Sequence, residues 1–233
     1  MYTNKRFNHE LVYIDDYIEK PKADGYRSIH VVFRYKNSNA KMYEGLFVEL
    51  QIRSRLQHAW ATAVETMGTF LGQALKSREG EQRWLDFFAV AGSAFAYREK
   101  TALVPGYESL SMVDTNRAVV QAENELKVLD KLQGFAVAGE AISKSNNRGR
   151  YNLIILDSLN KKVTISSFAK DQLEKATEEY ARVESRAKSD DKIEAVLVSA
   201  GPIEALRRAY PNYFLDAKAF VGIMQQIIAE GIK

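Results

Sequence analysis

Alternating apolar and polar residues in the first quarter of the chain predict a β-sheet. Residues 11–14 form a short apolar run, and residues 28–35 alternate before a turn signal. Residues 43–53 alternate as well, which would place Leu46, Val48, Leu50 and Ile52 on one face of a strand and Phe47, Glu49, Gln51 and Arg53 on the other. We expect the first face to feed a core and the second to present a polar row.

From residue 56 onward, the spacing of the apolar residues changes to that of a helix. Apolar residues spaced three or four apart predict helices over residues 56–71, 81–99 and 114–132, and Val104-Pro105-Gly106 ends or interrupts this helical region. We place a domain boundary near the end of the third helix. Residues 1–132 would then form one domain.

Short strands are predicted again beyond that boundary, at residues 135–142, 151–157 and 163–168. A charged helix over residues 169–187, a strand over 195–199, a helix opened by Gly201-Pro202 and a last helix over 216–229 complete the pattern, with Phe214 and Phe220 as expected core anchors. The fold class is therefore α+β. Residues 133–233 form a small C-terminal α+β module, for which we expect a structural or regulatory role.

Composition narrows the classes of function. The 233 residues include 33 basic and 30 acidic side chains, a net charge of only +3, so no overall charge signature of nucleic-acid binding exists. The chain has three histidines and no cysteine, which excludes disulfides and thiolate metal sites. No apolar run approaches the roughly 20 residues that span a bilayer, and no signal peptide is evident. We expect a cytoplasmic protein.

Residues 16–30 form a loop with chemistry suited to a nucleotide. Tyr17 and Tyr26 offer flat faces for a base, and Lys22, Arg27 and His30 can meet phosphate oxygens. The alternative is a charged hairpin loop that turns at Asp24-Gly25. The loop alone does not decide between these interpretations.

The strand Val48-Glu49-Leu50-Gln51-Ile52-Arg53 adds a second polar group of residues. A carboxylate such as Glu49 can hold Mg²⁺ or take a proton from a hydroxyl, and Arg53 can neutralise a phosphoryl group. The alternative is the solvated outer face of an antiparallel sheet.

Together the two segments resemble the synthetase domain of the RelA/SpoT family. The resemblance rests on Asp-Tyr-Ile-x-x-Pro-Lys-x-x-Gly-Tyr-Arg-Ser-Ile-His, then Val-Glu-Leu-Gln-Ile-Arg-Ser and Gln57-His58-Ala59-Trp60-Ala61, and it covers residues 15–72. It implies part of a nucleotidyltransferase-like mixed or antiparallel sheet with packed helices. It also implies a GTP diphosphokinase, which transfers pyrophosphate from ATP to the 3′-hydroxyl of GDP or GTP with Mg²⁺ as cofactor.

The resemblance also implies roles for individual residues. Tyr26 would stack on guanine, Lys22 and His30 would contact the phosphates of the acceptor, and Glu49 would be the catalytic residue that holds Mg²⁺ and activates the 3′-hydroxyl. Gln51 and Arg53 would support this acceptor site.

Two departures from the family pattern affect these expectations. Asp24 stands where the family has asparagine, although a carboxylate still accepts hydrogen bonds from the N1 and N2 donors of guanine. The basic cluster for ATP and a second Mg²⁺-binding carboxylate lie upstream of the matched motif in the family. We therefore expect an acceptor half-site that is inactive alone, completed by an N-terminal segment in trans or within a homo-oligomer.

Two other functions remain open at this level. A toxic small alarmone synthetase would act on adenosine nucleotides or on the 3′ end of tRNA, and the near-neutral charge does not favour tRNA. A non-catalytic regulatory protein would bind a nucleotide without turning it over.

Overall fold

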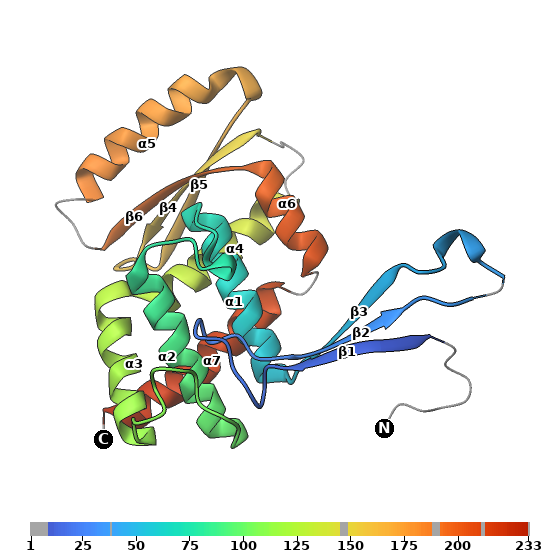
Figure 1. Cartoon of the computed structure of the whole chain (residues 1–233). Helices are drawn as coiled ribbons and strands as arrows, with labels where there is room; N and C mark the ends of the chain where they lie inside the picture. Colours follow the sequence, from blue (N-terminus) through green and yellow to red (C-terminus); the bar gives the residue numbers. More distant parts are fainter. Residues whose placement is uncertain (1–8, 38, 145–148, 188–191, 211–212, 233) are drawn as a thin grey trace.

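The chain folds as an α+β protein in which two small sheets flank a body of helices (Figure 1). This computed structural model describes residues 9–37, 39–144, 149–187, 192–210 and 213–232. Within this part of the chain, no helix is long and apolar enough to cross a bilayer. The α+β fold class predicted from the sequence is confirmed.

The first sheet is antiparallel and extends away from the helices (Figure 1). It contains β1 (Glu10–Asp16), β2 (Ile29–Arg34) and β3 (Phe47–Ile52), with β2 in the centre. The three strands fall where the alternating pattern predicts them. In the β2–β3 register, His30 lies opposite Gln51 and Val32 opposite Glu49, so the polar row of β3 continues onto β2.

The apolar face of this sheet is largely open to solvent, and the prediction that it feeds a core is wrong for the edge strands. Val31 of the central strand is 4% exposed, whereas its cross-strand partner Leu50 is 48% exposed. Five apolar residues that flank the central strand on this face are between 36% and 55% exposed, namely Leu11, Ile14, Leu46, Val48 and Ile52. The edge strands stay open because no described helix packs extensively against this sheet.

The helical body is built around the last helix of the chain. It contains α1 (Arg55–Leu71), α2 (Gln82–Glu99), α3 (Met112–Leu126), α4 (Val128–Lys144) and α7 (Tyr213–Gly231). The helix α7 packs against α1, α3 and α4, and its Phe220 and Met224 are fully buried. Phe220 is thus a core anchor as predicted, while the side chain of Phe214 lies outside the described residues.

The prediction of a single helix over residues 114–132 followed by a strand over 135–142 is wrong. The backbone turns at Lys127, whose φ is 53°, and α4 then continues without a break to Lys144. Leu132 and Phe135 are spaced for a helix and are fully buried, and Phe135 stacks on Phe70 of α1 with ring centroids 4.7 Å apart. Tertiary packing on α1 therefore favours the helix here.

The second sheet lies in the C-terminal part of the chain. It contains β4 (Tyr151–Asp157), β5 (Lys162–Phe168) and β6 (Ile193–Ser199) in the antiparallel order β5-β4-β6. The helix α5 (Leu173–Ala187) covers one face of this sheet. The helices α4 and α6 (Ala200–Ala209) pack against the sheet from the side of the helical body (Figure 1). Three short 3₁₀ helices complete the description, at Lys41–Tyr43, Leu75–Ser77 and Lys170–Gln172.

One cluster of buried side chains connects both parts of the chain. It extends from Tyr26 in the first loop through α1 and α2 to Val198 in β6 and Ile227 in α7. The domain boundary near residue 132 stays a prediction, and Leu132 itself is a buried residue within α4.

Two lysine substitutions test how the open face of the first sheet differs from its centre. We expect Leu50→Lys to change the free energy of unfolding by less than about 0.5 kcal/mol, because the side chain already lies half in water. Val31→Lys, its cross-strand neighbour, should cost more than about 3 kcal/mol because it buries a charge. Urea unfolding measures both. Similar large losses for both variants would mean that the face is covered in solution.

A pH-dependent stability is expected from Glu123, whose carboxylate accepts hydrogen bonds from the Leu129 backbone N–H at the start of α4, at 3.1 and 3.3 Å. Burial raises the pKa of Glu123 from 4.5 to about 7. The folded chain thus favours the protonated acid, and stability from this group falls as the pH rises from about 4.5 through about 7.

Glu123→Gln removes that penalty while keeping an acceptor for the N–H group. We expect the variant to gain about 1 to 2 kcal/mol at pH 8, a value reduced for partial solvent screening, and almost nothing at pH 4.5. Thermal unfolding at the two pH values measures this, with the exposed Glu125→Gln of the same helix as the control. An equal gain at both pH values would contradict the titration of Glu123.

Candidate nucleotide-binding site

The loop between β1 and β2 is held in one conformation by its own backbone and by α2. The Lys22 N–H donates to the Tyr26 carbonyl at 3.1 Å, and the Gly25 N–H donates to the Lys22 carbonyl at 3.0 Å. Gly25 has a φ of 96°, and a Cβ there would lie 2.7 Å from the Phe88 carbonyl. A Cβ on Gly92 of α2 would in turn lie 2.9 Å from the Gly25 Cα. Only glycine permits this close approach of loop and helix.

A buried ion pair connects the same loop to the helical body. The Arg27 side chain is 1% exposed, and its guanidinium lies 2.9 Å from the Glu99 carboxylate at the end of α2. It also donates to the Thr101 hydroxyl at 2.9 Å. Burial lowers the pKa of Arg27, and the charge of Glu99 opposes that effect. The sequence-based expectation that Arg27 meets phosphate oxygens is wrong in this conformation, because the guanidinium is enclosed.

Glu99 also fixes the start of α1. Its carboxylate accepts hydrogen bonds from the Ser54 hydroxyl and from the Gln57 side-chain amide, the latter at 3.2 Å. Ser54 and Gln57 form the capping box of α1, in which each side chain binds the backbone N–H of the other residue. The first loop, α1 and α2 therefore share one polar junction.

Tyr26 is an integral part of the core as well as of the site. Tyr26 is 8% exposed, and its ring packs edge to face against Trp60 of α1, with the ring centroids 6.3 Å apart. Its hydroxyl lies 2.7 Å from His30 Nε2 and accepts a hydrogen bond from the Arg53 guanidinium at 2.8 Å. Tyr26 therefore connects the loop to the polar row of the sheet.

Five of the predicted site residues close a ring of hydrogen bonds, which we call the site ring: Tyr26, His30, Glu49, Gln51 and Arg53. His30 Nδ1 lies 2.7 Å from the Glu49 carboxylate, and the Gln51 amide donates to the other Glu49 oxygen at 2.7 Å. The Arg53 guanidinium donates to the side-chain oxygen of Gln51, Oε1, at 2.6 Å and to the Tyr26 hydroxyl. The sequence therefore identified side chains that come together across two strands and a loop.

The directions of these hydrogen bonds assign the histidine tautomer. Arg53 can only donate, and in a neutral imidazole whose Nδ1 proton faces the Glu49 carboxylate, the Tyr26 hydroxyl donates to His30 Nε2. His30 then carries its proton on Nδ1 and donates it to Glu49. Every donor in the site ring therefore points, directly or through its neighbours, toward the Glu49 carboxylate.

Glu49 is the chemically distinct group of the site ring. The hydrogen bond from Gln51 lowers the pKa of Glu49, with smaller contributions from His30 and Arg53. The carboxylate side chain is 43% exposed, so a ligand can reach it. It is therefore ionised at neutral pH and offers its open side to a hydroxyl or a cation.

The arrangement of carboxylates bears on the expected Mg²⁺. Among the described residues, no group of three or more His, Asp and Glu side chains is placed to hold a metal ion. Mg²⁺ commonly binds through one or two carboxylates together with water and substrate phosphates. Glu49 fits the protein part of such a site only when a nucleotide supplies further ligands.

Lys22 lies over the aromatic rings of the loop. Its ammonium is 4.4 Å from the centroid of Tyr17 and 5.3 Å from that of Tyr26. Asp24, in contrast, uses one carboxylate oxygen to accept the Tyr26 backbone N–H at 2.9 Å. The role of Asp24 in reading a base stays a prediction.

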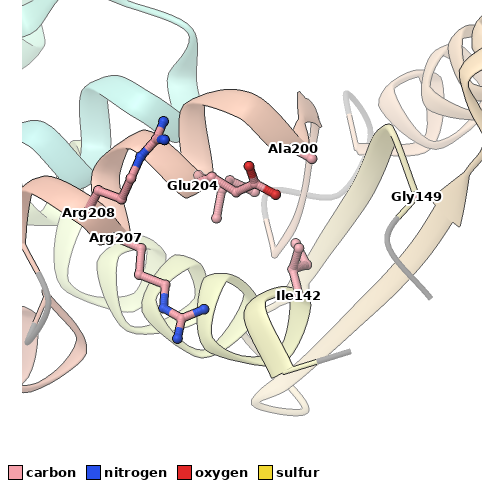
Figure 2. Close-up of a pocket in the computed structure, with 7 residues that line it drawn as sticks. Ile142, Gly149, Ala200, Glu204, Arg207 and Arg208 are labelled. Carbon is pink, nitrogen blue, oxygen red and sulfur yellow. The ribbon is translucent and has the colours of Figure 1, made fainter. Parts of the chain in front are cut away.

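A cavity of about 410 Å³ in the C-terminal part is a weaker candidate for a site. It lies between the ends of α4 and α6 and is lined by Ile142, Gly149, Ala200, Ile203, Glu204, Arg207 and Arg208. Figure 2 shows the guanidinium groups of Arg207 and Arg208 leaving α6 in different directions. They do not converge on one anion position as the donors of the site ring converge on Glu49.

Comparison with known families points to the same part of the chain. Residues 2–68 match the family model described as "Region found in RelA / SpoT proteins". The matched region contains the first sheet, the whole site ring and most of α1. A comparison of the chain with curated proteins gave no match. The region matched by this model thus contains the candidate site, and residues 69–233 lie outside it.

Sequence reasoning did not find the residues that support the matched region from elsewhere in the chain. Glu99 lies outside the matched region, and the sequence predicts for it only a place in the helix over residues 81–99. His58 drew no functional interpretation, yet its Nε2 lies 3.0 Å from the Asp216 carboxylate of α7. No local sequence signal shows contacts between residues this far apart.

The ion pair between Arg27 and Glu99 provides a test of this junction. We expect Arg27→Met to cost about 3 to 5 kcal/mol of stability, because the Glu99 carboxylate, whose side chain is only 13% exposed, loses its cation. The double variant Arg27→Met/Glu99→Gln should recover part of that loss. Arg34→Met is the control, since Arg34 is a half-exposed arginine on β2 whose Nε lies 3.9 Å from the Glu10 carboxylate. A cost below about 1 kcal/mol for Arg27→Met, by urea unfolding, would show that the junction is not a stabilising constraint.

Proposed function

We propose that the site ring binds the acceptor nucleotide of a RelA/SpoT-type pyrophosphate transfer. The acceptor would be GDP or GTP, and its 3′-hydroxyl would receive pyrophosphate from ATP. The observation that carries this proposal is the convergence of hydrogen bonds on the ionised, accessible Glu49 within the matched region. Groups that bind ATP are a further requirement of this reaction.

The chemistry assigned to Glu49 is general-base activation of the 3′-hydroxyl. The hydroxyl oxygen attacks the β-phosphorus of ATP, the bond to the bridging oxygen on the AMP side breaks, and AMP leaves. Glu49 takes the hydroxyl proton. His30 and Gln51 hold the carboxylate in place, and this positioning is what phosphoryl transfer chiefly requires of a protein.

Lys22 and Tyr26 would exchange partners when the acceptor binds. A base that stacks on the Lys22 side of the Tyr26 ring would take the place of the ammonium, while Arg53 lies 5.2 Å from the centroid of the same ring. The displaced ammonium then becomes available to a phosphate of the same nucleotide. The low exposure of Tyr26 means that this exchange must accompany binding.

Mg²⁺ would be held by Glu49 and by oxygens of the bound nucleotide. When bound, the ion would neutralise charge on the transferring phosphates. The protein contribution is the carboxylate itself, kept ionised by its hydrogen bonds.

Non-catalytic nucleotide binding is the second candidate function. It is favoured by the absence, among the described residues, of a cluster of carboxylates around Glu49. In this alternative the site ring would recognise the nucleotide, and the helices around α7 would respond to it. Transfer to adenosine nucleotides or to tRNA shares the same ring chemistry, and label from ATP would appear on those acceptors in place of guanosine nucleotides.

The first experiment is calorimetric titration of the chain with GDP and with ATP, each in the presence of Mg²⁺. The proposal expects selective binding of GDP. Labelled ATP added together with GDP then separates transfer from binding without turnover. Equal affinity for both nucleotides, or binding of neither, would contradict the proposed acceptor site.

Glu49→Gln tests the role of the carboxylate. We expect Mg²⁺ to strengthen GDP binding to the unaltered chain and to lose most of this effect in the variant, because an amide is a poor Mg²⁺ ligand. Binding without Mg²⁺ should stay within about 3-fold, and any turnover should fall by about 100-fold or more. Glu10→Gln is the matched control, an exposed carboxylate on β1 of the same sheet. Identical Mg²⁺ dependence in both variants would remove Glu49 from the metal site.

A further inference from the structure

A groove lies between the start of α1 and one face of α7, beside the site ring. Its volume is about 810 Å³, and we call it the α1–α7 groove. Its lining residues are Gln51, Arg53, Ser54, Arg55, Leu56, His58, Ala59, Asp216, Ala219 and Ile223. Gln51 and Arg53 belong to both the groove and the site ring, so the two are continuous.

The charge of the groove favours an anion. Arg53 and Arg55 lie on one wall, and the one carboxylate among the lining residues, Asp216, is already 3.0 Å from His58. Arg55 is exposed and makes no ion pair with any described carboxylate. The Nε atom of Arg53 is buried without a hydrogen-bond partner. The groove thus offers two guanidinium groups whose hydrogen-bonding capacity is only partly used.

The position of the groove relative to Tyr26 defines what can enter it. Arg53 donates to the Tyr26 hydroxyl, so the groove begins where the ring of Tyr26 ends. A nucleoside placed against Tyr26 and Glu49 would have its phosphate chain within reach of this opening. Pockets of this size hold molecules as large as a nucleotide.

We propose that the α1–α7 groove receives the phosphate chain of the acceptor nucleotide, with Arg55 as a phosphate-binding residue and α7 as the opposite wall. This inference rests on the proposed function. It gives the C-terminal part of the chain a direct place in the site, because Asp216, Ala219 and Ile223 all come from α7. This wall is anchored in the core, since α7 buries Phe220 and Met224.

Ala219 permits a test that leaves the core of α7 intact. It is exposed and lines the groove, so Ala219→Trp fills the groove without entering the buried face. Ala229→Trp is the matched control, an exposed alanine on the same helix that does not line the groove. Arg55→Ala has Arg117→Ala of α3 as its control, another exposed arginine outside the groove.

The experiment is calorimetric titration of the full chain and the four variants with GDP, guanosine and inorganic pyrophosphate. We expect both Arg55→Ala and Ala219→Trp to weaken GDP and pyrophosphate binding about 10-fold or more. Arg55→Ala removes a charge-assisted contact, and Ala219→Trp fills the groove. The affinity for guanosine should be unchanged in all four variants. The two control variants should also bind GDP and pyrophosphate as the unaltered chain does.

The three probes separate failure of the inference from failure of the proposed function. If GDP and guanosine bind but neither groove variant weakens GDP or pyrophosphate, the groove does not hold the phosphate chain and the acceptor site stands. If GDP does not bind while pyrophosphate binds in an Arg55-dependent way, the anion groove stands and the proposed acceptor is wrong. Binding of none of the three probes overturns both.

Discussion

The buried ion pair between Arg27 and Glu99 is the constraint on which the arrangement of the site depends. It joins the first loop to the end of α2, and through Ser54 and Gln57 the same carboxylate fixes the start of α1. Tyr26 directly precedes Arg27, and Arg53 directly precedes Ser54. Tyr26 and Arg53 of the site ring are therefore both held by the polar junction that Arg27, Glu99 and Ser54 form.

The site ring illustrates how a sheet that projects into solvent can present a defined chemical group. Each side chain in it is fixed by two neighbours, so little rotational freedom remains to be lost when a ligand binds. The ring also couples its members. A cation at Glu49 would weaken the attraction between the carboxylate and the His30 N–H, and the hydrogen bond between Tyr26 and His30 would respond. Occupancy at the carboxylate is thereby linked to the conformation of the aromatic loop.

How far the sequence predicts this structure depends on the range of the interactions. The strands of both sheets and the helices α1 and α2 follow from alternation and helical spacing, which are local signals. The site residues of β3 were predictable because alternation places Glu49, Gln51 and Arg53 on one face. The helix over residues 135–142 was missed because its apolar residues fit either period, and its stacking on Phe70 decides between them. The enclosure of Arg27 and the contact of His58 with Asp216 depend on distant residues, so no local pattern contains them.

The position of α7 at the centre of the helical body has a consequence for biosynthesis. Ribosomes deliver the first sheet, α1 and α2 long before residues 213–231 emerge, yet those residues pack against α1, α3 and α4. The buried faces of three earlier helices consequently wait for the last one. The nascent chain must keep these apolar surfaces apart from other proteins until residues 213–231 have left the ribosome, and the groove wall beside the site ring cannot form before then.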